Sequence, residues 1–151
     1  MSERTARAVL NDLIETCRDG ARGLQNAAAL IKDAALESLL LDLAEERSGF
    51  AGELEPHAQR LGGDAAAQGT AAAAMHRGWM DLKSVLTSHD DQAVMAEVVR
   101  GDAVTLRVFA DAVGGMLPPS IRDVIEKQER RIRAGHARIE DAMQRARVHT
   151  P

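Results

Sequence analysis

The chain has 151 residues, of which 45% are hydrophobic and only 2% aromatic, and it carries a formal net charge of −4 at pH 7. This length and apolar content suit one domain over residues 1–151, and the scarcity of aromatic residues argues for packed helices against a β-sandwich or barrel. The mildly acidic balance argues against nucleic acid as a partner, because neutralising phosphates requires a concentrated basic face.

The sequence has no candidate membrane span or signal region and only one cysteine, and these features constrain the compartment and the redox chemistry. No apolar run approaches the roughly 18 residues of a membrane span, and Met1-Ser2-Glu3-Arg4 lacks a hydrophobic signal region. We therefore expect no membrane association and a cytoplasmic location. Cys17 is the only cysteine, which excludes an internal disulfide and a thiolate metal cluster. Its place on an apolar helical stripe predicts a buried, inert thiol.

Helical periodicity predicts two pairs of long helices with a shorter helix between the pairs. The expected helices span residues 4–32, 34–61, 71–87, 91–116 and 119–147. Gly62-Gly63-Asp64 ends the second of them, and Gly114-Gly115 precedes the break before the last. The connection from Gly62 to Asp90 is far longer than a helical hairpin needs.

A connection of this length indicates a crossover from one end of a bundle to the other, because short loops join only neighbouring antiparallel helices. The expected helix at 71–87 would be long enough, with its flanking loops, to traverse the bundle. The sequence therefore predicts an all-α, ferritin-like four-helix bundle with a long helix-containing crossover between the second and third helices.

Four local motifs resemble those of one protein family. They are LNDLIETCRDG at Leu10–Gly20, FAGEL at Phe50–Leu54, HRGWMDLK at His76–Lys83, and Leu117-Pro118. The chain resembles a functionally uncharacterised, mainly proteobacterial family of short ferritin-like four-helix-bundle proteins, known as a domain of unknown function. The resemblance covers nearly the whole chain and implies a ferritin-like fold with no established activity, substrate or cofactor. It also implies a Glu in relatives where this chain has Asp102.

The ligand set of a ferritin-like di-metal site is incomplete in this sequence. Such sites use a Glu from each of two helices and a Glu-x-x-His pair from each of the other two. No Glu-x-x-His pair is present, and Asp12, Glu15 and Asp19 lie away from the apolar stripe of the first helix. We therefore expect no metal or other cofactor, neither di-iron nor di-manganese. The alternative is a di-metal carboxylate oxidoreductase, or a metal-binding or storage protein, with a degenerate site drawn from Glu46, Glu53, His57, Glu97 and Asp102.

Three polar residues fall inside the apolar stripes of three different helices: Arg47, Asp102 and Gln128. Buried charges are tolerated when they are paired and hydrogen-bonded, so we expect these three to satisfy one another and to fix the helix register. One alternative is a functional interpretation, in which Asp102 with neighbours such as Glu46 or Glu97 binds a metal or a small polar ligand. The other is a bent or rotated helix that moves these residues to the surface. His136 lies near the edge of the fourth stripe, where a boundary or core histidine is expected.

The segment His76-Arg77-Gly78-Trp79 brings an imidazole, a guanidinium and an indole together in the crossover. No Ser, Cys or second His is placed by the sequence to complete a catalytic set. We expect Trp79 to anchor the crossover on the first hairpin and Arg77 to pair with Asp12 or Asp19. No catalytic residue is assigned. The leading interpretation is a non-enzymatic structural or protein-interaction module that self-associates as a homo-oligomer, with a dimer expected.

Overall fold

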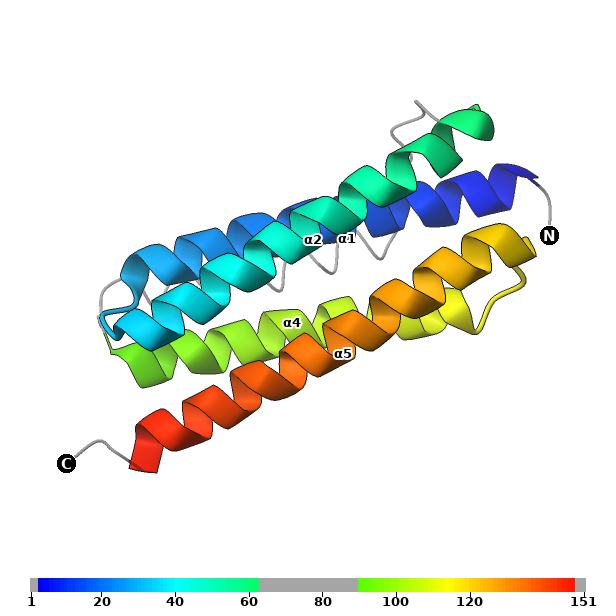
Figure 1. Ribbon diagram of the computed structural model, residues 1–151. Helices are drawn as coiled ribbons and strands as arrows, with labels where there is room; N and C mark the ends of the chain where they lie inside the picture. Colours follow the sequence, from blue (N-terminus) through cyan, green and yellow to red (C-terminus); the bar gives the residue numbers. More distant parts are fainter. Residues whose placement is uncertain (1–2, 63–89, 149–151) are drawn as a thin grey trace.

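The computed structural model describes residues 3–62 and 90–148 (Figure 1). These residues are all-helical, and they contain no strand. The four helices are α1 (Glu3–Leu30), α2 (Ala34–Arg60), α4 (Asp91–Val113) and α5 (Pro119–Val148). The prediction of an all-α chain with four long helices is confirmed, whereas the helix expected at 71–87 lies outside the described residues.

Aspartate side chains cap the N-termini of two of the helices. Asp33 accepts a hydrogen bond from the backbone N–H of Leu36 at 3.0 Å at the start of α2, and Asp90 accepts one from Gln92 at 3.0 Å at the start of α4. Each carboxylate satisfies an N–H group that has no partner within its own helix. These caps fix where the second and third long helices begin.

The end of α4 differs from the expectation drawn from periodicity. The helix ends at Val113 and not at residue 116, because Gly114-Gly115 caps and breaks it. Met116, the last residue of the helix expected over 91–116, therefore lies outside the helix and is 74% exposed. Leu117 is buried in its place and joins the apolar core.

The helix arrangement places α2 and α4 diagonally opposite each other, because α1 packs against α2 and α4 while α5 packs against α4 and α2. At one end, the Asp91 carboxylate accepts from the backbone N–H groups of Lys32 and Asp33 at 2.9 and 3.0 Å. At the other end, the Arg7 guanidinium donates to the carbonyl oxygen of Gly62 at 3.0 Å. The helices α2 and α4 therefore run in the same direction, and the end of α2 lies at the opposite end of the bundle from the start of α4 (Figure 1).

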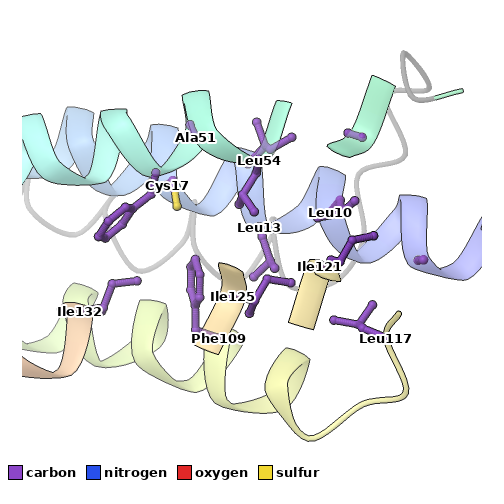
Figure 2. Close-up of a cluster of buried hydrophobic side chains, with 14 residues drawn as sticks. Leu10, Leu13, Cys17, Ala51, Leu54, Phe109, Leu117, Ile121, Ile125 and Ile132 are labelled. Atoms are coloured by element: carbon purple, nitrogen blue, oxygen red, sulfur yellow. The ribbon is translucent and has the colours of Figure 1, made fainter. Parts of the chain in front are cut away.

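Two clusters of buried apolar side chains fill the two halves of the bundle. Figure 2 shows the cluster near the chain's start, in which Leu13 and Cys17 of α1 face Phe109 of α4 and Ile125 of α5. The other cluster uses the later part of α1, the early parts of α2 and α4, and the later part of α5. Between the clusters lies a level to which α2 contributes Arg47, which is as buried as the apolar residues around it.

Candidate functional site

The candidate site is a charged cluster at this middle level of the bundle. Arg47 lies on the core-facing side of α2, between Leu43 and Phe50, and Asp102 lies at the corresponding place in α4; both are 0% exposed. The Arg47 Nη1 group donates to Asp102 Oδ1. Because α2 and α4 are diagonal neighbours, the long arginine side chain reaches across the centre of the bundle to make this contact.

A third member of the cluster comes from α5. His136 Nδ1 lies 2.9 Å from the other carboxylate oxygen of Asp102, and His136 Nε2 lies 3.6 Å from Glu140 Oε1. The His136 side chain is 13% exposed, so it is the part of the cluster nearest to solvent. The carboxylate of Asp102 thus joins a cation from α2 to an imidazole from α5, and the contact connects three of the four helices.

The electrostatics of the cluster lower the pKa of Asp102 and raise that of His136. Burial by itself would raise the pKa of Asp102, but the hydrogen bond with His136 and the charge of Arg47 outweigh it and hold the pKa below its ordinary value. The hydrogen bond with Asp102 raises the pKa of His136, against the opposing effect of burial. The charges of Asp102 and Glu140 act in the same direction, and Arg47 opposes them.

Gly135 explains how α5 admits a buried guanidinium. A Cβ atom at this position would lie 2.9 Å from Leu43 Cδ2 and 3.2 Å from Arg47 Nη2. Any side chain here would therefore push against both the arginine and the leucine. The glycine lets the backbone of α5 approach the Arg47 side chain directly, at a cost in helix propensity of about 1 kcal/mol.

Gln128 is buried as the sequence indicated, but its partners are different from the expected ones. Its Nε2 group donates to the carbonyl oxygen of Phe50 at 3.3 Å and lies 3.5 Å from Glu53 Oε2. Neither Arg47 nor Asp102 is bonded to it, and His136 is the residue that completes the pair. The reason is that Gln128 and Arg47 lie at different levels of the bundle. Gln128 on α5 faces the stretch of α2 that begins at Phe50, one turn beyond Arg47.

Cys17 lies in the core on α1 and is 0% exposed. Burial raises the pKa of its thiol to about 12; the nearby charge of Arg47 lowers it and that of Glu53 raises it further. A thiol with this pKa stays protonated at neutral pH, and thiols react as nucleophiles or metal ligands in the thiolate form. The residue therefore has the properties of a packing side chain.

The five metal candidates come from α2 and α4, and most of them contact other side chains. Glu46 lies 3.5 Å from Arg131, His57 contacts Arg60 at 2.6 Å, and Glu97 pairs with Arg100. Glu53 is exposed apart from its contact with Gln128, and Asp102 is engaged by Arg47 and His136. In residues 3–62 and 90–148, no group of three or more His, Cys, Asp or Glu side chains is arranged to hold a metal ion.

The expected docking site of the crossover falls partly outside the described residues, because His76, Arg77 and Trp79 lie there. The two acids proposed to receive Arg77 are on α1. Asp19 accepts from Arg22 Nη2 at 2.5 Å and its side chain is 15% exposed, and Asp12 is half-buried. The docking of the crossover stays a prediction.

Comparison with known proteins places the chain in a family without an assigned role. Residues 5–115 match a family model described as "Domain of unknown function (DUF2383)". The matched segment contains Arg47 and Asp102, whereas Gly135 and His136 of α5 lie beyond it. No curated protein matches the chain. None of the helices in the described part of the chain combines the length and apolar character needed to cross a membrane.

Proposed function

Because the chain belongs to the DUF2383 family, a domain of unknown function, we propose that it is a non-enzymatic, ferritin-like helical bundle that acts as a structural or protein-interaction module. The shared direction of α2 and α4 supports the ferritin-like assignment. Because α2 and α4 run parallel, residues 63–89 between them must connect one end of the bundle to the other. Ferritin-like bundles have one long connection of this kind.

The observation that carries the proposal is the pairing of Arg47 with Asp102 at the centre of the bundle. Ferritin-like di-metal centres need several inward carboxylates free to neutralise two cations. Here a buried carboxylate is already neutralised by a guanidinium, which has no lone pair to offer a metal. The fixed positive charge of Arg47 also repels a metal cation at this level of the bundle.

Metal analysis tests this proposal against the alternative of a metal-dependent oxidoreductase or storage protein. The purified protein, before and after incubation with ferrous iron or manganese, is expected to contain far less than two metal ions per chain by elemental analysis. It is also expected to leave the rate of ferrous oxidation unchanged. A reproducible content near two ions per chain that disappears in the Asp102→Ala variant would establish the metal-dependent alternative.

We also propose that the protein self-associates as a dimer through the outer side of α2. Gly49 and Gly52 lie inside this helix, and a Cβ atom at either would meet nothing within 4 Å. Each glycine costs about 1 kcal/mol of helix stability relative to alanine, and no neighbour in residues 3–62 or 90–148 requires it. A second helix can approach closely at glycine, and Leu41 adds an exposed apolar side chain on this side (44%).

The charges on α2 support an antiparallel pairing with α2 of a second copy. If the two helices cross near Gly52, Glu45 of each copy lies opposite Arg60 of the other. Sedimentation velocity should detect a dimer for the wild type and a monomer for Gly52→Arg. The matched control, Ala134→Arg on an exposed position of α5, should leave the dimer intact. A wild-type monomer at every concentration tested would contradict the dimer proposal without affecting the bundle itself.

The cytoplasm is the proposed compartment, and the single cysteine supports it, because disulfides form and persist in oxidising compartments outside the cytosol. A fluorescent fusion located by microscopy, with fractionation as a second readout, tests this assignment.

A further inference from the structure

His136 turns one ring nitrogen toward the buried carboxylate and the other toward solvent. Its Nδ1 atom lies 2.9 Å from Oδ2 of Asp102. That carboxylate is paired with the Arg47 guanidinium and only accepts hydrogen bonds, so Nδ1 must carry the proton. Nε2 has no hydrogen-bond partner within the described part of the chain, and it is not a buried atom. In the neutral imidazole, Nε2 therefore holds a lone pair that solvent can reach.

Glu140 places a carboxylate beside this nitrogen. It follows His136 by four residues on α5, so the two side chains lie on one face of the helix. Glu140 Oε1 lies 3.6 Å from His136 Nε2, which is too long for a hydrogen bond, and the Glu140 side chain is 56% exposed. A nitrogen lone pair and a carboxylate oxygen thus lie next to each other at the surface without being bonded.

The separation of these two atoms suits a shared zinc ion. Zinc binds an imidazole nitrogen and a carboxylate oxygen at about 2.1 Å each in tetrahedral geometry, which places the two ligand atoms about 3.4 Å apart. The observed separation is 3.6 Å, and a small rotation of the exposed Glu140 side chain can close a difference of this size. Imidazole and carboxylate are both ordinary zinc ligands in proteins.

The hydrogen bond to Asp102 distinguishes His136 from an ordinary surface histidine. Histidines that bind metals almost always donate their other ring N–H to a carboxylate, a carbonyl group or water, which fixes the ring orientation and makes the nitrogen that binds the metal more basic. Asp102 takes this role from α4. Its carboxylate also joins the imidazole to Arg47, and with Glu140 it supplies two negative charges near the imidazole against one positive charge. The local charge therefore favours a cation.

We propose that His136 Nε2 and Glu140 Oε1 bind one zinc ion on the surface of α5, with Asp102 as the positioning residue that orients the imidazole. In residues 3–62 and 90–148, no third His, Cys, Asp or Glu joins this pair. Water or a group from another molecule therefore completes the tetrahedral coordination. The site lies at the edge of the bundle and goes beyond the proposed function, because it is separate from a di-metal centre in the core. Its failure would leave the structural or interaction role unchanged.

Zinc titration of the intact chain, first stripped of metal with a chelator, tests the proposal. Long-range proton–nitrogen correlation spectra report the bonding state of each imidazole nitrogen, and the His136 signals are identified by their loss in the His136→Gln variant. On addition of zinc chloride, the Nε2 resonance of His136 should shift and saturate, while Nδ1 keeps its proton. A His136 spectrum that zinc leaves unchanged would overturn the proposal.

The Glu140→Gln variant removes the second ligand. Loss of an outer-shell partner alone commonly weakens metal affinity about 10–100-fold, so we expect the zinc concentration that half-saturates the His136 signal to rise at least about tenfold. Asp141→Asn is the matched control, because it removes the same charge from the next residue of α5, whose carboxylate lies 3.4 Å from Arg145. The control should leave half-saturation unchanged. Equal half-saturation in the wild type and Glu140→Gln, or an equal rise in both variants, would overturn the proposal.

Discussion

The replacement Arg47→Met tests whether the Arg47–Asp102 pair holds the centre of the bundle together. Methionine keeps most of the aliphatic volume, so the loss due to an empty cavity is small. The main effect is the stranded carboxylate of Asp102 in a position with 0% exposure. Removing one partner of a buried ion pair costs about 3–5 kcal/mol. Because Asp102 keeps its contact with His136 at 2.9 Å, we expect the free energy of unfolding to fall by about 3 kcal/mol.

Replacing the other partner, in Asp102→Val, should reduce the free energy of unfolding more than Arg47→Met does. It removes the acceptor of Arg47 Nη1, and the Nε and Nη2 groups have no hydrogen-bond partner within the described part of the chain. Arginine does not lose its proton in proteins, so it cannot relieve the burial by becoming neutral. We expect a loss near the upper value of about 5 kcal/mol, whereas the double replacement removes both charges and should cost less than about 2 kcal/mol.

Urea denaturation followed by circular dichroism gives the free energies of unfolding for the wild type, both single variants and the double variant. The cycle should yield a coupling energy of several kcal/mol, because the two single losses together greatly exceed the double loss. If the single losses instead add to within about 0.5 kcal/mol of the double loss, the two side chains do not interact and the reasoning about the central pair is refuted.

Three further predictions concern the surroundings of this pair. The stabilisation from His136 should be complete below its unfolded-state pKa of about 6.5 and lost as pH rises through its raised folded-state pKa; the stability difference between wild type and His136→Gln should therefore shrink toward alkaline pH in urea titrations, and a constant difference would contradict it. Gly135→Ala should destabilise the protein by about 1–3 kcal/mol, because the added methyl group clashes with Leu43 and Arg47. Gly49→Ala, measured in dilute monomer, should instead stabilise it by up to about 1 kcal/mol. Equal effects of the two replacements in thermal unfolding would contradict the steric argument. Cys17 should resist a thiol reagent in the folded state and react fully in urea, because its pKa is raised to about 12; rapid labelling of the native protein would show that the residue is accessible.

The four long helices could be predicted well from the sequence because helical periodicity is strong over these segments. The apolar spacing located α1, α2, α4 and α5, and Gly62 marked the end of α2. The error at Met116 arose because the periodic pattern continues past Gly114, and periodicity alone does not weigh the cost of two consecutive glycines in a helix.

The site was less accessible to sequence reasoning, for a geometric reason. Arg47 and Asp102 fall at the centre of their stripes, so their burial follows from helical spacing alone. His136 sits at a stripe edge, where a small rotation of α5 decides between core and solvent, and its role depends on that rotation. Gly135 becomes informative only when α2 is placed against it. The unused second oxygen of Asp102 was the available signal that a further donor had to be present.

The central claim is that a guanidinium-carboxylate-imidazole cluster, and not a metal centre, occupies the middle of this bundle. A crystal structure of the protein grown with manganese and recorded with anomalous scattering tests it most directly. The account predicts density for the Arg47 guanidinium against Asp102 and no anomalous peak among Glu46, Glu53, Asp102 and Gln128. Anomalous peaks ligated by Asp102, with the Arg47 side chain displaced from the core, would contradict it.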